Sequence, residues 1–371
     1  MSSQRQLVLN LFIYPGGHHE AAWRYKGSEP GRILDITNYQ ELAQRAEASK
    51  FDAIFFADGP ALADNVRYAQ RFRFEPITWL AAIAAVTKRI GLIATASTTY
   101  TEPYNLARLF ASLDHVGKHF RVRGPLNISR VPQGRPVYVQ AGASDDGRAF
   151  AARFAEAIFT AHQTLDSAKA FYADIKRQAR TFDRGSDEIK ILPGISPFIG
   201  STQAEADHLQ DEFNALIQPE YSLTQLRQMI GVDLTGYDLD GPVPRHLIDT
   251  ASARGVASRF KLVVDIVDRE KPTIRQLVQR LAGARGHWVI AGTPEKIADN
   301  IQTWFEGGAA DGFNVMPPWL PGGFDTFAEQ VVPILRKRGL FRDDYTGTTL
   351  REHYGLARPA SIYSNAVKAI A

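Results

Sequence analysis

Two adjacent histidines stand close to the end of an expected buried strand. His18 and His19 follow the apolar run at residues 7–13, and Trp23 and Arg24 come next. Adjacent histidines do not present both rings to one ion as an i, i+4 pair on a helix does, so the pattern does not favour a metal site. One histidine lining a polar pocket is the preferred interpretation, and a surface loop without a role is the alternative.

Three short polar side chains stand at or after the ends of other expected strands. They are Asp58, Thr95 and Ser144. Hydroxyl groups can donate hydrogen bonds to a planar ring or a sugar chain, and a serine at a helix start brings backbone N–H groups towards a phosphate. Each residue has a structural alternative: Asp58 as a cap, Thr95 as an ordinary strand residue, and Ser144 as a helix N-cap.

A third histidine, His287, precedes a helix start that a capping threonine and a proline mark. A pocket role and a loop role are equally supported for it. Arg24, Arg67, Arg71 and Arg73 could select a carboxylate, although such a run is more typical of a solvated surface. No acid pair, nucleophile elbow, Walker loop or dinucleotide motif follows a strand, so hydrolases, kinases and Rossmann enzymes lack support.

Short β-branched or aromatic runs alternate with amphipathic patterns along the chain. This alternation indicates a parallel sheet covered by helices, and the expected architecture is an α/β TIM (β/α)8 barrel with its active site at the carboxyl ends of the strands. The predicted strands are residues 7–13, 53–57, 90–96, 136–141, 157–161, 189–199 and 312–316. The predicted helices are residues 39–49, 76–88, 105–113, 145–154, 165–182, 202–217, 294–306 and 324–338.

The barrel plan lacks one strand. Eight strands are required, but only seven are predicted, and the vacancy lies between residues 113 and 136. That stretch is too short, and too rich in glycine and charge, to supply a strand and a helix. We therefore predict that strand 4 is absent from the sequence, and we expect a gap in the chain at residues 115–116.

The remainder of the chain is interpreted as one domain, residues 1–371. Residues 218–285 lie before the last βα unit, and part of this stretch is rich in proline, glycine and aspartate. The barrel pattern resumes after it. This stretch is therefore expected to be an insertion into the barrel and not a separate domain.

Composition excludes several classes of protein. The 43 Lys and Arg residues and 40 Asp and Glu residues give a net charge of +3, which argues against binding to nucleic acid or an anionic membrane. The chain has no cysteine, which excludes disulfide scaffolds, thiolate metal sites and cysteine nucleophiles. No membrane span or signal peptide is recognisable. We expect a cytoplasmic protein that acts on a small molecule.

Nine motifs in order along the chain carry a resemblance to a known family. They are Phe-Ala-Asp at 56–58, TTYTEPYNLAR at 98–108, SLDH at 112–115, VRGPLN at 122–127, PQGRP at 132–136, QAGAS at 140–144, AGTP at 291–294, ADGFN at 310–314 and TLREHYGL at 349–356. They resemble the nitrilotriacetate monooxygenase component A family, within the bacterial-luciferase-like flavin monooxygenases. The resemblance runs nearly end to end.

The resemblance implies a two-component, FMN-dependent monooxygenase with a TIM-barrel fold. A separate NAD(P)H:FMN reductase would supply reduced FMN, and this protein would use it with O2 to oxidise a small organic substrate. By similarity, Asp58 and Thr95 would lie near the flavin ring and ribityl chain, and Ser144 at the phosphate. His19 and His287 are carried as pocket candidates for catalysis. Family habit suggests a homodimer or a homotetramer.

One departure from the family coincides with the missing strand. Family members continue after the SLDH motif with a strand and a helix that hold further flavin contacts, and neither is present here. Either the natural chain has lost the strand, or the written sequence omits residues; we favour the second. Two other functions stay open: a deazaflavin-dependent oxidoreductase on the same barrel, and a flavin-binding homologue without catalysis.

Overall fold

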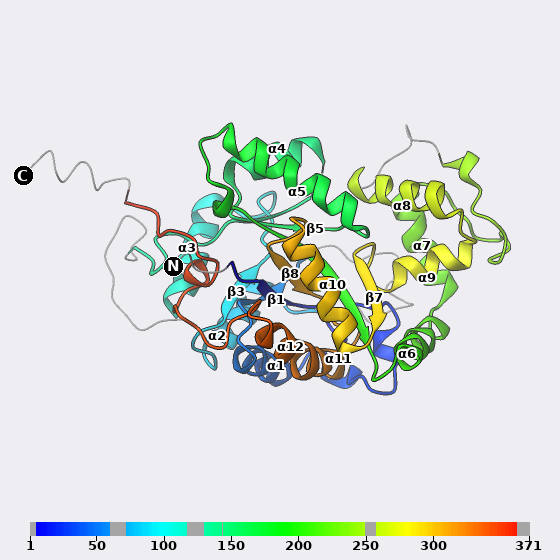
Figure 1. Ribbon diagram of the computed structural model, residues 1–371, viewed down its shortest axis with the longest axis horizontal. Coiled ribbons are helices and arrows are strands. Elements are labelled where there is room, and N and C mark those ends of the chain that lie inside the picture. Colours follow the sequence, from blue (N-terminus) through cyan, green and yellow to red (C-terminus); the bar gives the residue numbers. More distant parts are fainter. Residues whose placement is uncertain (1–4, 60–71, 117–129, 143, 249–256, 362–371) are drawn as a thin grey trace, which may run out of the picture.

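Seven parallel strands form the wall of a nearly closed barrel in the computed structural model (Figure 1). The structure describes residues 5–59, 72–116, 130–142, 144–248 and 257–361. The strand order is β3-β2-β1-β8-β6-β5-β4, with β7 paired to β6 outside that path. The predicted α/β barrel is therefore confirmed. The strands are β1 (Val8–Ile13), β2 (Ala53–Phe56), β3 (Gly91–Ala94), β4 (Val139–Ala141), β5 (Ala157–Thr160), β6 (Lys190–Ile199), β7 (Trp288–Gly292) and β8 (Gly312–Val315).

Helices surround this sheet, and most begin with the capping signals seen in the sequence. Thr293, for example, accepts a hydrogen bond from the N–H of Lys296, and Pro294 follows it as the first helical residue. No helix in the described ranges is long and apolar enough to cross a bilayer. The helices are α1 (Ile36–Ala48), α2 (Pro76–Ala84), α3 (Pro103–Val116), α4 (Asp145–Phe154), α5 (Leu165–Arg180), α6 (Gln203–Ala215), α7 (Pro219–Ile230), α8 (Ala257–Glu270), α9 (Ile274–Ala282), α10 (Pro294–Glu306), α11 (Gly322–Thr326), α12 (Val332–Lys337) and α13 (Leu350–His353).

Strand β1, which lies between β2 and β8, is buried on both of its faces. Leu9 and Leu11 belong to the apolar cluster between the sheet and its outer helices, whereas Val8 and Phe12 belong to the cluster inside the barrel. Alternate residues of a strand point to opposite faces, so an all-apolar run is what a strand covered on both sides requires. Burial on both faces explains why continuous apolar runs in the sequence predicted the strands.

One strand, β7, was not predicted. It pairs in parallel with the distal half of β6, where Trp288 lies opposite Ile195 and Gly292 opposite Ile199. The first half of β6 pairs with β5, so this ten-residue strand extends past its first neighbour and needs a second partner. Strand β7 is short and ends two positions before Pro294, the first residue of α10. Only the helix start was therefore recognised from the sequence of this stretch.

The barrel wall is open between β3 and β4. Among the described residues, β3 pairs only with β2, and β4 pairs only with β5. The vacancy expected from strand counting is thus present in the structure. Helix α3 includes both His115 and Val116 at its end. The expected omission of residues at 115–116 stays a prediction.

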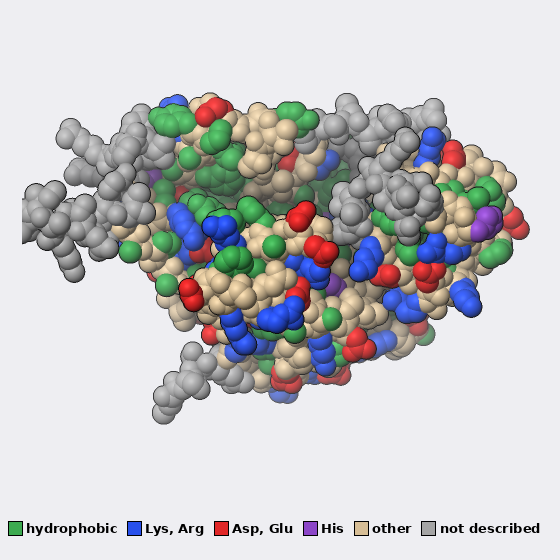
Figure 2. Space-filling view, turned by 90° about the horizontal axis from the view of Figure 1, so that it is seen from above, with side chains coloured by type: hydrophobic (Ala, Val, Ile, Leu, Met, Phe, Trp, Pro, Cys, Tyr) green, Lys and Arg blue, Asp and Glu red, His purple; other side chains and the backbone are tan. Residues whose placement is uncertain are grey.

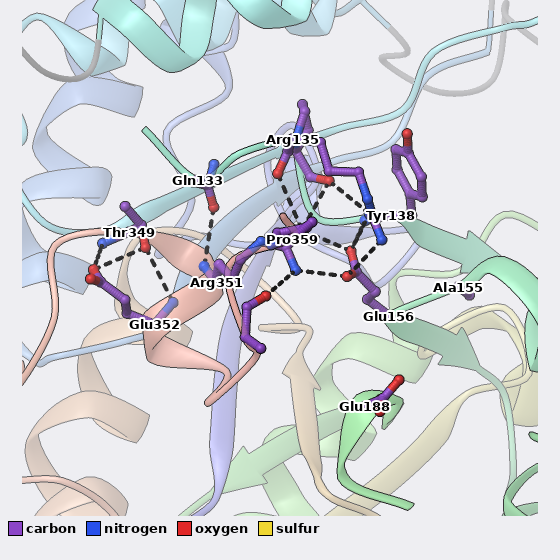
Figure 3. A network of polar contacts seen from close by, with 12 residues as sticks. Gln133, Arg135, Tyr138, Ala155, Glu156, Glu188, Thr349, Arg351, Glu352 and Pro359 are labelled. Atoms are coloured by element: carbon purple, nitrogen blue, oxygen red, sulfur yellow. Dashed lines mark hydrogen bonds and ion pairs between the residues drawn. The ribbon is translucent and has the colours of Figure 1, made fainter. Parts of the chain in front are cut away.

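The base of this opening is bridged by the short helix α13. Arg351, only 2% exposed, donates two hydrogen bonds of 2.7 and 3.0 Å to the carboxylate of Glu156, just before β5 (Figure 3). Arg135, before β4, donates two more of 2.7 and 3.0 Å to the same carboxylate. On the other side, Leu350 packs so closely against β3 that a Cβ at Gly91 would lie 2.6 Å from its Cδ1. Helix α13 therefore connects the two edges.

The expected insertion, residues 218–285, contains α7, α8 and α9. These helices share their own buried cluster, which includes Leu226, Ile230, Val263 and Leu277. Figure 1 shows them at one side of the molecule, away from α1 to α3. The insertion also reaches the barrel, because the Ser222 hydroxyl donates a hydrogen bond to Glu20. The division of the chain into one domain with an insertion stays a prediction.

Candidate functional site

The three residues predicted to contact a cofactor follow the carboxyl ends of three barrel strands. Asp58 comes after β2, Thr95 after β3 and Ser144 after β4. Because the strands are parallel, these positions share one rim of the sheet. Asp58 and Thr95 are half-buried, and Ser144 is exposed. The Asp58 carboxylate accepts a hydrogen bond of 2.7 Å from the N–H of Gly59.

Ser144 is the N-cap of α4. Its hydroxyl oxygen accepts a hydrogen bond of 3.2 Å from the N–H of Gly147, and Asp145 and Asp146 stand in the first turn. A capping oxygen of this kind satisfies one free N–H of the helix start. The cap is therefore real, and the serine O–H is still able to donate to a bound group. A phosphate contact by Ser144 stays a prediction.

The adjacent histidines are buried in different surroundings. His18 donates from Nε2 to the carbonyl of Phe12 at 2.8 Å and accepts at Nδ1 from Arg285 at 2.8 Å. Burial, and then the charge of Arg285, lowers the pKa of His18 well below 6.5, so its ring is neutral. This ring lies at the end of β1, where the sequence placed a polar pocket.

His19 lies instead in an aromatic layer between β6 and α6. Its ring centroid is 6.2 Å from that of Phe198 and 5.1 Å from that of Phe213, both edge-on. Its Nδ1 accepts a hydrogen bond of 3.2 Å from the N–H of Ala21, and burial lowers its pKa to about 3. His18 and His19 both line a small cavity that Arg285 also lines. His287 instead lies near His18 through its contacts with Phe159 and Arg259. Pocket roles for His19 and His287 in catalysis stay predictions.

His287 stacks on Phe159 of β5 and contacts an arginine from the insertion. The two ring centroids are 4.7 Å apart with an angle of 5° between the planes. The Nε2 atom accepts a hydrogen bond of 3.1 Å from Arg259 of α8. Burial, followed by the charges of Arg259 and Arg285, lowers the pKa of His287 well below 6.5. A neutral imidazole is the form that accepts this hydrogen bond.

His18, Arg259, Arg285 and His287 form what we call the histidine–arginine cluster. Arg285 lies 4.5 Å from the centroid of the Tyr14 ring, in addition to its contact with His18. Arg259 contacts no carboxylate in the part of the chain that the structure describes. Burial, and then the charge of Arg285, lowers the pKa of Arg259 to about 10. The cluster is positively charged at neutral pH.

Arg259 and Arg285 were not among the predicted site residues. Arg285 stands two positions before His287, which is a signal that the sequence offers. Arg259 has no such signal, because it lies in α8 of the insertion and reaches the cluster only in the folded chain. Of the arginines proposed from sequence, Arg73 lies 5.8 Å from the Tyr14 ring centroid. Arg24 donates to the carbonyl of Leu216 at 2.6 Å, and the other two, at positions 67 and 71, lie outside the described residues.

Three phenylalanines form an aromatic floor below this cluster, inside the barrel. Phe12, Phe55 and Phe159 come from β1, β2 and β5, with ring centroids 4.4 to 5.6 Å apart. Phe12 and Phe55 stack with 29° between their planes, whereas Phe159 stands edge-on to both. After β5, Gln163 donates a hydrogen bond of 3.4 Å from its amide nitrogen to the carbonyl of Gly286, and its side-chain oxygen is buried with no hydrogen-bond partner among the described residues. Aromatic rings near an unused acceptor fit a planar heterocycle that carries N–H groups, such as a flavin ring. No group of three metal-binding side chains occurs in the described ranges.

Comparison with known proteins places this chain in a family. The sequence model of the luciferase-like monooxygenases matches residues 17–118 and 114–311. The chain is 40% identical to N-acetyl-S-(2-succino)cysteine monooxygenase of Bacillus subtilis, over 98% of this chain and 99% of that protein. It is 38% identical to nitrilotriacetate monooxygenase component A of Aminobacter aminovorans, over 97% and 98%. The chain belongs to the luciferase-like monooxygenase family.

A solved member of this family has the same fold. EDTA monooxygenase from Chelativorans sp. BNC1 superposes with a TM-score of 0.74 at 30% identity, over 95% of this chain and 99% of that one. The resemblance found in the motifs is thus confirmed along almost the whole length.

The family model matches this chain in two segments and not in one. Its two matched segments overlap at residues 114–118, and α3 ends within this overlap, at Val116. The opening in the barrel wall lies at the same place, between β3 and β4. Thr95 and Ser144 follow these two strands, so two of the predicted flavin contacts flank the opening.

Proposed function

We propose that this chain is a flavin-dependent monooxygenase that uses reduced FMN and O2 to oxidise a small organic substrate bearing an anionic group. Family membership supports the reaction class. The observation that carries the substrate class is Arg259, a half-buried guanidinium that contacts His287 and has no carboxylate partner in the described ranges. A buried charge is costly unless an opposite charge compensates it. An anionic group of the substrate would supply that compensation.

The rim residues would hold the flavin. Asp58 and Thr95 would contact the ring and ribityl chain, and Ser144 with the start of α4 would contact the phosphate. The aromatic floor offers the ring an apolar face, and the Gln163 oxygen offers it an acceptor. When bound, the reduced flavin supplies the electrons that activate O2.

The neutral histidines would orient the substrate side of the site. His287 is fixed by its stacking on Phe159 and holds Arg259 by accepting its hydrogen bond. His18 holds Arg285 in the same way. Each imidazole thus fixes the direction of one guanidinium, and guanidinium groups bind carboxylates in defined geometries. His18 and His287 are proposed as positioning residues for the two arginines.

A separate NAD(P)H:FMN reductase would supply the reduced flavin. The relative named component A is, by that name, one part of a multi-component enzyme. In this chain, no glycine-rich dinucleotide motif follows a strand. A nitrilotriacetate-monooxygenase-like reaction is one form of the proposed activity.

The test is oxygen transfer to acid and ester forms of the same compound. The chain would be combined with FMN, NADH, a flavin reductase and ¹⁸O2, with nitrilotriacetate or N-acetyl-S-(2-succino)cysteine as substrate probes. We expect one ¹⁸O atom in the product of at least one acid and about tenfold lower kcat/KM for its methyl ester, the effect of losing a charge-assisted hydrogen bond. Equal turnover of acid and ester would contradict the anionic substrate class.

Two arginine variants provide the matched comparison. Arg259→Met should raise KM for the acid while FMN binding, followed by flavin fluorescence, stays unchanged. Arg275→Met is the control, because Arg275 lies on the surface in an ion pair with Asp240. If both variants behave alike, Arg259 does not bind the substrate.

The open barrel wall favours a second candidate function. A flavin-binding homologue without productive turnover would bind FMN but would not shelter it from water, because two of its proposed flavin contacts flank the opening. This alternative predicts FMN binding with hydrogen peroxide as the reduced-oxygen product and no oxidised substrate. Product analysis in the same ¹⁸O2 experiment separates the two candidates.

A further inference from the structure

A small cavity lies between the loop that follows β1 and the insertion helices α7 and α9. Its volume is about 40 Å³, which is room for about three water-sized groups. His18 and Arg285 line it, so it adjoins the histidine–arginine cluster. Leu226 of α7 and Leu281 of α9 form apolar parts of its wall. The cavity is therefore a candidate for the part of the substrate that stands next to the anionic group.

The wall of this cavity carries one carboxylate, that of Glu20, which is held from two helices. The N–H of Glu20 donates a hydrogen bond of 3.0 Å to the carbonyl of Ala282, the last residue of α9. Its carboxylate accepts a hydrogen bond from the hydroxyl of Ser222 in α7, a residue that is 4% exposed. A carboxylate accepts up to about four hydrogen bonds. Glu20 can therefore accept from a bound group and keep the hydrogen bond from Ser222.

Glu20 and Arg285 give the cavity one acidic and one basic side chain. Because the space between its walls is small, a ligand that reaches both must carry its acid and its hydrogen-bond donor within a few bonds of each other. An α-amino-acid unit has this arrangement, since its carboxylate and its N–H group share one carbon. Trp23 and Tyr221 also line the cavity, and the faces of aromatic rings favour positively charged N–H groups. The wall thus fits a nitrogen beside an acid.

Surface charge offers little selection of this kind. Figure 2 shows Lys and Arg side chains interspersed with Asp and Glu side chains on the face seen from above. The net charge of the whole chain is +3. A mixed surface of this kind attracts neither anions nor cations strongly over long distances. Selection by charge therefore depends on groups inside the site, such as Glu20 and Arg285.

We propose that Glu20 is a specificity-determining residue: it accepts a hydrogen bond from the N–H group of an α-amino-acid unit in the substrate, whose carboxylate binds Arg285. The N–H group is an ammonium in a free or alkylated amine and an amide in an acylated one. This inference rests on the proposed function for the anionic group, and it adds the nitrogen beside that group. An analogue without N–H would desolvate the Glu20 carboxylate and give it no donor in exchange, which weakens binding.

Two pairs of compounds test the proposal by titration calorimetry on the full chain. Iminodiacetate and oxydiacetate differ in an ammonium group against an ether oxygen. N-acetyl-S-(2-succino)cysteine and S-(2-succino)-3-mercaptopropionate differ in an acetamide group against a hydrogen atom. Each titration is run without flavin and with saturating oxidised FMN. We expect the nitrogen-bearing compound to bind at least tenfold more tightly in at least one pair. Equal affinities within both pairs, or no saturable binding of any compound, overturns the proposal.

A conservative variant tests the residue itself. Glu20→Gln keeps the length of the side chain and an acceptor for Ser222, but it removes the charge. The affinity ratio within the discriminating pair should fall about fivefold or more, because a hydrogen bond to a charged acceptor is the stronger kind. Glu220→Gln is the matched control, since Glu220 is an exposed residue of α7 that does not line the cavity. An unchanged ratio in Glu20→Gln, with the variant still folded by thermal unfolding, contradicts the role of Glu20.

Failure of this inference is distinguishable from failure of the proposed function, because binding is measured without oxygen transfer. A preference for the nitrogen-bearing compounds without ¹⁸O in any product keeps Glu20 as a specificity-determining residue and removes the monooxygenase assignment. Oxygen transfer together with equal binding in both pairs keeps the proposed function and overturns the role of Glu20.

Discussion

At the residue scale, a serine that caps a helix can also hold a phosphate, and the two roles of Ser144 are separable by mutation. Ser144→Ala and Thr202→Ala each remove the N-cap of one helix, α4 and α6. Each should lower the free energy of unfolding by about 1 kcal/mol. Only Ser144→Ala should also weaken FMN binding, measured by flavin fluorescence. Equal FMN affinity in both variants would show that Ser144 is only a cap.

The buried imidazoles predict how stability depends on pH. The folded chain holds His18 and His287 with pKa values well below 6.5, so between those values and 6.5 the unfolded chain binds more protons. The free energy of unfolding should therefore fall as the pH decreases below 6.5, by at most about 1.4 kcal/mol per pH unit for each histidine. Urea unfolding between pH 7.5 and 5.5 measures this slope.

A pair of histidine variants isolates that contribution. His287→Gln keeps an acceptor for Arg259 but removes the titrating group, so the slope should become shallower. His208→Gln is the control, because the His208 side chain is 77% exposed. A slope that is the same in both variants would exclude His287 as its source.

The candidate residues show which parts of the site are readable from sequence. His287 and the rim residues stand directly beside strand ends or helix starts, which are local signals. Arg259 has no such signal, because its contact with His287 depends on how α8 folds back over the barrel. His19 could not be separated from His18 for the same reason: neighbouring side chains point into different packing layers.

At the scale of elements, the attachment of α13 depends on one carboxylate. Burial alone would raise the pKa of Glu156, but the hydrogen bonds from Arg351, the N–H of Tyr138 and Arg135 bring it below the usual 4.5. Stability from this group is present above pH 4.5 and is lost as the pH falls through the lowered pKa. Glu156→Gln should lower the free energy of unfolding at pH 7 by about 3 to 5 kcal/mol, because Arg351 is left buried without its counter-charge.

Denaturation at pH 7 and pH 3 checks this prediction. The difference in the free energy of unfolding between the natural chain and Glu156→Gln should become smaller at pH 3. At that pH, Glu156 carries a proton more often in both the folded and the unfolded chain. Glu188→Gln, a change at a side chain that is 60% exposed, should have little effect at either pH. A difference that does not change with pH would show that the ion pair does not stabilise α13.

The elements themselves were largely predictable. All seven strands of the barrel wall coincide with predicted apolar runs, because a strand covered on both faces must be apolar throughout. Strand β7 was not predicted, because it forms by pairing with the second half of the ten-residue strand β6. The length of β6 is a property of another segment of the chain. The helices of the insertion were not predicted individually, because their apolar faces pack on one another and not on the sheet.

At the scale of the whole molecule, the missing strand was predictable because a closed barrel imposes a count. Eight parallel strands close a barrel of this kind, and a chain that supplies seven to the wall must leave two edges. The count says nothing about what happens at those edges. Their separation by α13 and the exposed phenylalanines of α4 depend on three-dimensional contacts that no local pattern encodes.

Closing the wall within one chain should therefore stabilise the molecule. The alignment with the Bacillus subtilis monooxygenase spans 440 positions, but 98% of this chain is only about 364 residues, so about 76 positions have no counterpart here. If this stretch is inserted after Val116, the strand expected in it can pair with both edges, and the helix expected after that strand can cover the exposed side chains of Phe150 and Phe154. The chimera should unfold at a higher temperature, and it should bind less of the hydrophobic dye ANS, because exposed apolar surface is removed. A glycine–serine insert of equal length is the control, since a flexible loop adds entropy without pairing. Equal melting temperatures for the two chimeras would mean that the edges at β3 and β4 do not accept a strand, even when it is covalently supplied.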